Sequence, residues 1–392
     1  MRIAVFAARK KHRSYARKLK SVLEQKPDVS VSILWYKNLW QEAGWLSVSP
    51  PQKCSVLRQI VLDQVRTKQN SPEWLDKSSG LLFFFYRLLK TAEASISYRV
   101  YFHALKSRRI TALLIWNGLK FRQRICVEAA KALNIPCYFI ERGAFPGTTT
   151  LDPKGINYLN SVPRDPAFFR SHHAALPAPF IDYSSPHPPS LPASYVFIPF
   201  QVNTDSQIVL FSPWIQNMKV LVRTLMDIYS AAGSSMPDIV LKTHPSCDQK
   251  YSAVEALLTN HPKIHFAHNL STQDLIFHAD AVATINSSVG LEALLMQKKV
   301  IVMGQAFYDI PGITLSAQDK HGLKDALENV VTWEADSALR ESFLAHVASD
   351  HVVNGRWQDA SEEHMIEMSE HLLTLLPMAQ KQKTDTSVNH VP

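Results

Sequence analysis

The chain has 392 residues, of which 46% are hydrophobic and 19% are charged, and its formal net charge is +8. A chain of this length is too long for a single hydrophobic core, so we expect two domains. The positive charge favours an anionic partner such as nucleic acid, lipid or an acidic substrate. The four cysteines form no C-x-x-C pair, which indicates neither a zinc knuckle nor a dithiol redox site, and no apolar run approaches the ~18 residues of a membrane-spanning helix. A soluble or peripheral protein is expected.

The first half of the chain alternates between apolar runs and helical segments, as a β-α-β unit does. Continuous apolar strands are typical of a parallel sheet that is buried on both faces. The run from Leu81 to Tyr86 is expected to lie in the core, with a membrane-resting edge as the alternative. We predict a Rossmann-like lobe at residues 1–162, with strands at 2–8, 31–36, 110–116 and 137–140 and helices over much of 52–106 and over about 119–133.

Residues 163–193 contain many prolines and no regular period. Proline fixes φ and removes a hydrogen-bond donor, so this stretch is predicted to connect two domains. A second Rossmann-like lobe is predicted at 194–350, then a C-terminal helix at 351–377 and a disordered tail at 378–392. The predicted fold is α/β, with two parallel-sheet lobes facing a central cleft and a helical C-terminus. The strands of the second lobe are predicted at 195–199, 238–243, 281–285 and 299–303, and its helices at 213–232, 272–278 and 288–297.

Two strand ends in the second lobe carry groups that can hold a phosphate. Ser287 and Ser288 fall where a helix begins, and a helix start offers free N–H groups and the positive end of the helix dipole. Lys242, His244 and Pro245 end another strand, where an imidazole can donate to a phosphate oxygen or act as an acid toward a leaving group. The alternatives are a pair of capping serines and a solvated loop histidine.

Other polar side chains of this lobe suit contacts with a nucleoside and a sugar. Gln201, Asn203 and Asp205 follow its first strand, in a loop rich in amides and hydroxyls that is otherwise simply solvated. Glu292 is placed to reach a ribose hydroxyl or to cap its own helix. Tyr308, after the strand at 299–303, is placed to stack on the nucleoside.

Two carboxylates of the first lobe are candidates for the chemistry. Glu141 directly follows the strand at 137–140, and a carboxylate there can act as base, nucleophile or oxocarbenium stabiliser in glycosyl transfer. Asp152 lies in a turn-rich loop and is the second candidate, although the role of an Asx-turn residue fits it equally well.

A basic segment follows the first strand. Arg9, Lys10, Lys11 and Arg13 are placed to dock an acidic acceptor or an anionic membrane surface, and the alternative is a solvated helix face. The sequence has no Gly-x-Gly-x-x-Gly after the first strand, no Walker A motif, no Asp-x-Asp and no RNA-binding aromatic signature. We therefore expect no dinucleotide, no metal and no nucleic acid.

Several segments together resemble the capsule polysaccharide synthesis and export family of bacterial Kdo transferases, most closely its KpsS-like (LipB-like) members. They span both lobes and comprise residues 141–143, 146–157, 201–208, 212–214, 241–245 and 284–312. The resemblance implies a GT-B fold and a retaining β-Kdo transferase. It further implies transfer of Kdo from CMP-Kdo, without a cofactor, to a phosphatidylglycerol acceptor at the inner face of the cytoplasmic membrane. The implied location is cytoplasmic and peripheral to the inner membrane, with a second Kdo transferase and the capsule export machinery as partners.

By the same resemblance, His244 and Ser287-Ser288 match CMP-binding His-Pro and Ser-Ser elements, and Glu141 takes the place of an acidic residue before a glycine. Many relatives have two acidic residues there, whereas this chain has Arg142 in the second place, so Glu141 and Asp152 both stay candidate nucleophiles. Two other functions stay open: a non-catalytic export or assembly factor that binds lipid-linked polysaccharide, and a GT-B enzyme that uses another nucleotide sugar.

Overall fold

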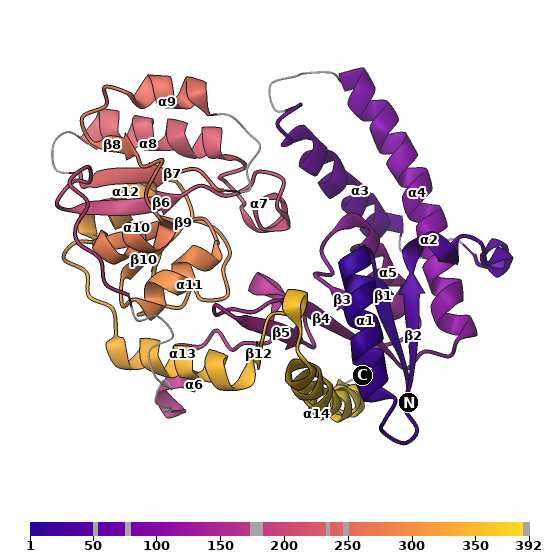
Figure 1. The fold of residues 1–392 in the computed structure, drawn as a ribbon. Coiled ribbons are helices and arrows are strands. Elements are labelled where there is room, and N and C mark those ends of the chain that lie inside the picture. Colours follow the sequence, from indigo (N-terminus) through magenta and orange to yellow (C-terminus); the bar gives the residue numbers. More distant parts are fainter. Residues whose placement is uncertain (50–53, 75–79, 173–182, 233–235, 246–250, 387–392) are drawn as a thin grey trace, which may run out of the picture. The chain divides into compact units, whose positions relative to one another are not determined.

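The structure is a computed structural model that describes residues 1–49, 54–74, 80–172, 183–232, 236–245 and 251–386. The chain forms two compact units, each built around its own sheet (Figure 1). The first unit comprises Met1–Val65, Ser79–Ser161 and His351–Pro392, and the second comprises Arg66–Ser78 and Val162–Asp350.

The first unit has a six-stranded sheet in the order β12-β5-β4-β3-β1-β2. Strands β2, β1, β3 and β4 are parallel, whereas β5 runs antiparallel to β4 and β12 antiparallel to β5. The order reverses between β1 and β3, which is where open α/β sheets bind their ligands, beyond the carboxyl ends of the strands. The strands are β1 (Arg2–Ala7), β2 (Ser30–Trp35), β3 (Ala112–Trp116), β4 (Cys137–Arg142), β5 (Thr148–Asp152) and β12 (Val353–Asn354).

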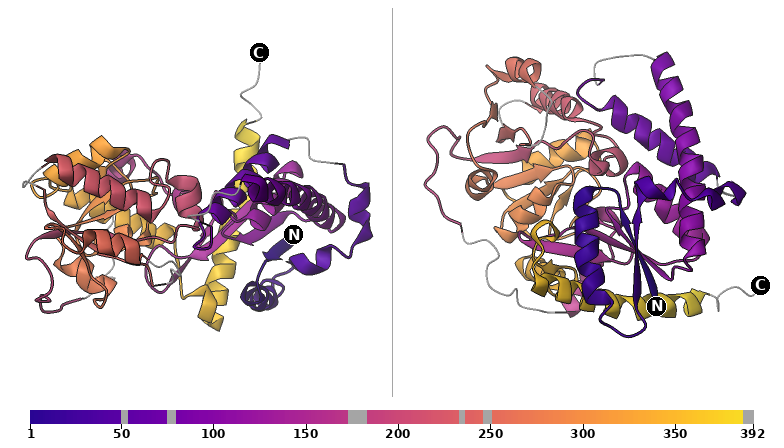
Figure 2. Two further views of the ribbon diagram at one scale, coloured as in Figure 1. Left: turned by 90° about the horizontal axis from the view of Figure 1, so that it is seen from above. Right: turned by 45° about the vertical axis from the view of Figure 1, so that its right-hand side comes forward.

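Helices cover this sheet, and the last of them comes from the far end of the chain (Figure 2). Helix α14 packs on α1, and the Tyr15 hydroxyl lies 3.0 Å from Nε2 of His364. Trp357 also packs edge to face against Trp116 of β3. The helices are α1 (Lys10–Leu23), α2 (Tyr36–Leu39), α3 (Cys54–Gln69), α4 (Gly80–Ser107), α5 (Phe121–Ala132) and α14 (Glu362–Thr386), with 3-10 turns η1 (Ala43–Ser47), η2 (Asn157–Leu159) and η4 (Trp357–Asp359).

The second unit has a fully parallel sheet in the order β11-β10-β9-β6-β7-β8. Counted within the unit this is the Rossmann order, with its reversal between β6 and β9. The strands are β6 (Tyr195–Pro199), β7 (Asp238–Lys242), β8 (Ile264–Phe266), β9 (Ala281–Thr284), β10 (Lys299–Val302) and β11 (Leu315–Ser316). The helices are α6 (Pro166–Ser171), α7 (Ser206–Phe211), α8 (Met218–Ala232), α9 (Ser252–Leu258), α10 (Thr272–His278), α11 (Ser288–Leu295), α12 (Lys320–Asn329) and α13 (Ser337–Asp350).

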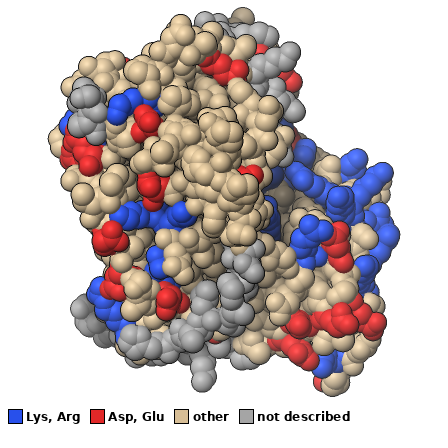
Figure 3. All heavy atoms as spheres, turned by 60° about the vertical axis from the view of Figure 1, so that its left-hand side comes forward, with Lys and Arg blue, Asp and Glu red and all other residues tan. Residues whose placement is uncertain are grey.

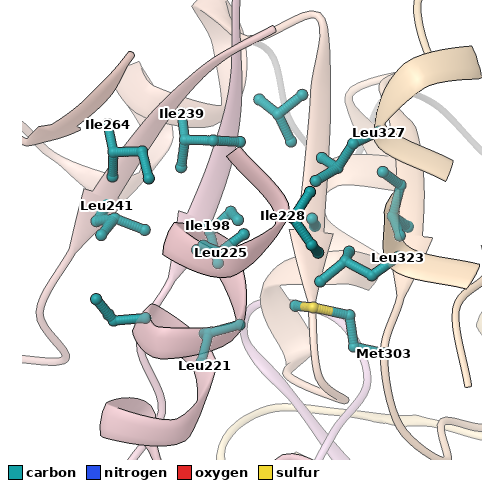
Figure 4. Packing of buried hydrophobic residues seen from close by; sticks show 14 of the residues in the cluster. Ile198, Leu221, Leu225, Ile228, Ile239, Leu241, Ile264, Met303, Leu323 and Leu327 are labelled. Carbon is teal, nitrogen blue, oxygen red and sulfur yellow. The ribbon is translucent and has the colours of Figure 1, made fainter. Parts of the chain in front are cut away.

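One helix shows how the second core forms. Leu221, Leu225 and Ile228 of α8 follow the i, i+4, i+7 spacing of one helix face, and all are at most 1% exposed. They pack against sheet residues such as Ile198 and Leu241 (Figure 4). Truncating a leucine in such a core costs about 2–5 kcal/mol.

The predicted α/β fold with two Rossmann-like lobes and a helical C-terminus is confirmed. Strand β5 was not predicted, because Thr148–Asp152 is short, polar and followed by turn residues. The stretch at 163–193 is more than a connector, since it contains α6, whose Phe169 is fully buried against Phe343. Helix α14 continues to Thr386, where we expected a disordered tail from residue 378, and residues 387–392 lie outside the described residues.

The core position expected for the run from Leu81 to Tyr86 is wrong. Leu81, Leu82, Phe84 and Phe85 are between 44% and 70% exposed on the first turns of α4. The first residue of α4 that belongs to the core is Ala94.

Candidate functional site

The predicted site residues of the second unit gather at one edge of its sheet. Because all six strands are parallel, the loops that follow β6, β7, β9 and β10 leave from the same edge. These loops carry Gln201 to Asp205, His244, Ser287 and Tyr308 respectively. The edge includes the reversal between β6 and β9, the expected ligand position in this fold.

Two side chains bridge that reversal. The buried Gln201 donates from Nε2 to Oδ1 of Asn286 at 3.0 Å, and its Oε1 accepts from the Asn286 N–H at 3.2 Å. Asn286 in turn donates to the carbonyl oxygens of Gln207 and Phe211. This paired amide contact fixes the loop that leads into α11. Asn286 was missed in the sequence, although it directly precedes the serine pair.

The serine pair forms the start of α11 as predicted. Ser287 is the N-cap residue, and its Oγ accepts from the Val289 N–H at 3.2 Å. Ser288 is the first helical residue and is exposed. The turn therefore presents an exposed hydroxyl at the positive end of a helix dipole, which is chemistry that suits a phosphate. The N–H groups of Val289 and Gly290 bond to the hydroxyl and the carbonyl oxygen of Ser287.

Tyr308 stabilises this turn through a hydrogen bond to its backbone. It is 2% exposed, and its hydroxyl donates to the carbonyl oxygen of Ser287. A Cβ at Gly290 would lie 2.5 Å from that hydroxyl, so glycine is needed for the close approach. The prediction that Tyr308 stacks on a nucleoside is wrong, because its ring is buried under α11.

His244 follows β7 at the same edge and is half-buried. Burial lowers the pKa of His244, and the Asp205 carboxylate acts in the opposite direction. The imidazole of the free protein is therefore neutral at pH 7 and offers one N–H to an anion. Lys242, by contrast, donates to the Leu270 carbonyl oxygen, and Pro245 is exposed beyond the strand end.

The other predicted sugar-binding residues have structural roles. Asn203 is 2% exposed, and its Oδ1 accepts from the Met218 N–H at 2.9 Å, which holds the start of α8. Asp205 caps α7 by accepting from the Gln207 N–H at 2.8 Å, but it is itself exposed. Glu292 is half-buried in the second turn of α11, and its charge acts on Tyr308. Asp205 and Glu292 thus stay candidates for ligand contacts, whereas Gln201 and Asn203 hold the loops through hydrogen bonds.

In the first unit Glu141 lies near the end of β4 and is half-buried. Its Oε2 accepts from Nδ2 of Asn117 at 2.8 Å, and its Oε1 accepts from the Arg142 N–H at 3.0 Å. Asn117 directly follows β3 and has a φ of 63°, a left-handed conformation that asparagine tolerates. Each carboxylate oxygen uses one lone pair in these bonds and keeps another, so the group is oriented and still able to react.

Asp152 has a different environment. It is fully buried; its Oδ1 accepts from the N–H groups of Lys154 and Gly155, and its Oδ2 from the N–H and hydroxyl of Ser161, at 2.6–3.0 Å. His351 Nδ1 lies 3.3 Å from the same Oδ2. The Asn160 amide nitrogen lies 3.1 Å from His351 Nε2, so the ring proton belongs on Nδ1, facing Asp152. The carboxylate closes the loop at 152–161 and has no lone pair left for attack, which favours the Asx-turn role over catalysis.

The basic segment opens α1. Arg9, Lys10 and Lys11 are exposed, and Arg13 lies over the Trp35 ring at 5.7 Å. Figure 3 shows that Lys and Arg side chains gather on part of one face of the molecule. His12, between these cations, is buried and stacked on Trp116, and burial lowers its pKa to about 4. The segment thus presents its cations outward and its histidine to the core.

A cavity of about 980 Å³ lies elsewhere in the first unit, between η1, α3, α4 and α5. Its lining residues in the described part of the chain include Tyr98, Lys106 and Arg109 and none of the predicted site residues. Among the described residues, no three His, Cys, Asp or Glu side chains lie close enough together to hold a metal ion, and no helix is both long and apolar enough to cross a membrane.

The GT-B-like class predicted from the sequence is confirmed in its two parallel-sheet lobes and helical C-terminus. Residues 184–357 match the family described as capsule polysaccharide biosynthesis protein. The match covers less than half of the chain, and together with the relatives below it confirms the resemblance to KpsS-like members of that family.

Individual relatives match parts of the chain. Protein FixF of Sinorhizobium fredii is 36% identical over 256 residues, which are 63% of this chain and 61% of FixF. Capsule polysaccharide export protein KpsS of Escherichia coli is 33% identical over 127 residues, which are 31% of this chain and 32% of KpsS. The chain thus spans less than two thirds of either relative. Among solved structures, the β-Kdo 2,7 transferase of Thermosulfurimonas dismutans KpsC covers 71% of this chain and 89% of its own, with 20% identity and a TM-score of 0.43.

Proposed function

We propose that this protein is a retaining glycosyltransferase that moves Kdo from CMP-Kdo to an anionic lipid, phosphatidylglycerol, and so starts the linker of a capsular polysaccharide. The observation that carries the proposal is the edge of the second sheet, where the exposed Ser288 follows β9 at the start of α11 and the half-buried His244 follows β7, on the two sides of the fold's ligand position between β9 and β6. The capsule family match at residues 184–357 covers this whole edge.

In this proposal the second unit holds the donor. The phosphate of CMP-Kdo accepts hydrogen bonds from the N–H and hydroxyl of Ser288 and from one N–H of His244, at the positive end of the α11 dipole. Glu292, one turn further along α11, faces the ribose. Gln201, Asn286 and Tyr308 do not touch the ligand; they keep the serine turn in place through the bonds described above. Neither a metal nor a cofactor is assigned, because the sequence has no Asp-x-Asp of a metal-bound diphosphate sugar.

The first unit supplies the nucleophile. The Glu141 carboxylate attacks the anomeric carbon of Kdo, the bond from that carbon to the phosphate oxygen breaks, and CMP leaves with the electron pair. The lipid hydroxyl then attacks the same carbon, releases its proton to water and expels the carboxylate. Two inversions give net retention. Asn117 orients Glu141 throughout and is its positioning residue.

The remaining assignments concern the surroundings of the reaction. The exposed Arg9, Lys10 and Lys11 accompany the anionic acceptor at the membrane surface. The protein would then act in the cytoplasm, peripheral to the inner membrane, with a second Kdo transferase and the capsule export machinery taking its product. These assignments rest on the family match and on the charge of α1.

Nucleotide binding tests the donor assignment. Calorimetry should show that CMP binds and that UDP at the same concentration does not compete, because the resemblance is to CMP-sugar enzymes. Ser288→Ala and His244→Ala should each weaken CMP at least fivefold, while Ser271→Ala, which removes the N-cap hydroxyl of α10, should not. Preference for UDP would favour an enzyme of another nucleotide sugar, and binding of neither nucleotide would refute the donor site.

A further inference from the structure

The first half of α4 presents a bare apolar face. Six large side chains, Leu81, Leu82, Phe84, Phe85, Leu88 and Leu89, are each between 44% and 70% exposed. At 100° per residue they occupy one arc of roughly 160° around the helix. Phe83, Tyr86 and Lys90 lie on the opposite arc and are half-buried. A helix of a globular protein normally turns such an apolar stripe inward, whereas this one turns it to solvent.

The side of α4 opposite this face contacts the rest of the unit. The Tyr86 hydroxyl accepts from Nε2 of Gln64 on α3 at 3.2 Å. Glu93, which directly precedes the first core residue Ala94, pairs with Lys90 at 2.5 Å and with Arg122 of α5 at 2.8 Å. The inner side of the helix is thus fastened to α3 and α5, and the outer side cannot turn inward to hide its leucines and phenylalanines.

The charges on α4 itself and on α1, which starts at the same edge of the sheet but on its other face, indicate the kind of partner. Between Gly80 and Ala92 the sequence has no acidic residue, and Arg87 is exposed beside the apolar arc. Helix α4 leads directly into β3 and runs back along it, so its first turns lie at the carboxyl edge of the sheet, beyond the strand ends (Figures 1 and 2). Helix α1 starts at the same edge, since it follows β1, and contributes the exposed Arg9, Lys10 and Lys11.

We propose that the first turns of α4 insert into the interfacial region of an anionic lipid bilayer, with the cations of α1 and Arg87 resting on its headgroups. Leucine and phenylalanine on one face with basic residues beside it are the composition of interfacial helices. A protein partner with an acidic surface would pair with the cations but would not bury the six large apolar side chains. Glu141 lies near the carboxyl end of β4, at the same edge of this sheet, so insertion of the helix brings that carboxylate toward the lipid.

The inference deepens the proposed function, because it states where that reaction meets its lipid acceptor, but it can be tested without any donor sugar. The experiment is flotation of the full chain with vesicles of phosphatidylcholine alone or with a third phosphatidylglycerol. The variant Leu81→Gln/Phe85→Gln/Leu88→Gln removes the centre of the apolar arc and keeps good helix formers. The matched control Leu257→Gln/Val331→Gln/Ile366→Gln changes three apolar residues that are 43–66% exposed elsewhere.

The wild type and the matched control should float with the anionic vesicles, and the α4 variant should lose at least tenfold in partitioning. Arg9→Gln/Lys10→Gln/Lys11→Gln should lose binding to anionic vesicles chiefly at low salt. Equal flotation of the α4 variant, or no flotation of the wild type, would overturn the proposal. So would sedimentation of the wild type as a lipid-free dimer that the α4 variant converts to a monomer, since the face would then bind a second copy. Turnover on a short-chain soluble acceptor should be unchanged in the α4 variant. If the variant lost this turnover, the result would bear on the proposed transferase function and not on membrane insertion.

Discussion

One pair of substitutions can distinguish the roles of Asp152 and Glu141. The Asp152 carboxylate is fully hydrogen-bonded within the loop at 152–161, whereas each oxygen of Glu141 keeps a lone pair. In Asp152→Asn the side-chain nitrogen cannot accept a hydrogen bond, so two of the four bonds from Lys154, Gly155 and Ser161 are lost. The other two lose their charge assistance. Hydrogen bonds to a charged group contribute ~1.5–3 kcal/mol each, so we expect a loss of about 4 kcal/mol in the unfolding free energy of the first unit.

The assay combines urea unfolding, followed by circular dichroism, with turnover per folded molecule. Ser161→Ala is the graded control, since it removes one hydroxyl bond and should cost about 1 kcal/mol. Asp152→Asn should keep turnover within a few fold under conditions where it is folded. Glu141→Gln loses one of the two hydrogen bonds to Glu141 and should cost about 1–2 kcal/mol, less than Asp152→Asn. It should lose at least a thousandfold in turnover, by analogy with loss of other covalent nucleophiles. A stable but inactive Asp152→Asn protein would show that the structural assignment of Asp152 is mistaken.

Three further predictions concern the serine turn and the core of the first unit. Ser287→Ala should lower stability by about 1 kcal/mol because it removes an N-cap, whereas Ser288→Ala should leave the melting temperature unchanged; equal melting of both would contradict the capping assignment. Tyr308→Phe should cost about 1 kcal/mol and weaken CMP a few fold in calorimetry, because the Ser287 carbonyl loses its donor; unchanged affinity would mean that the turn does not depend on it. The neutral His12 has a folded pKa of about 4 against 6.5 unfolded, so stability should be full above pH 6.5 and fall by roughly 3 kcal/mol as the pH drops to 4. In His12→Phe, which keeps a ring against Trp116, that part of the acid loss should disappear from pH-dependent unfolding curves.

The sequence predicted correctly those elements that depend on residues close together in the chain. Continuous apolar strands such as Tyr195–Pro199 predicted the parallel second sheet, since a strand buried on both faces has no polar alternation. The serine pair predicted the start of α11, because capping depends on residues two or three positions apart.

The features that were missed depend on residues far apart in the chain. The environment of Asp152 is completed by His351, which no local pattern could bring to it. Tyr308 follows a strand like its predicted neighbours, but its ring turns under α11 because Gly290 leaves room there. The apolar run on α4 has the composition of a core helix, and only the position of its neighbours leaves one side uncovered.

The most direct measurement of the central claim is a transfer reaction followed by mass spectrometry. The purified protein is incubated with CMP-Kdo and a short-chain phosphatidylglycerol, beside Glu141→Gln and a wild-type sample with EDTA. We predict a lipid heavier by one Kdo and an equal amount of CMP in both wild-type samples, and neither in the variant. A folded, CMP-binding protein that yields no such lipid, or a Glu141→Gln protein that yields as much as the wild type, would contradict the account.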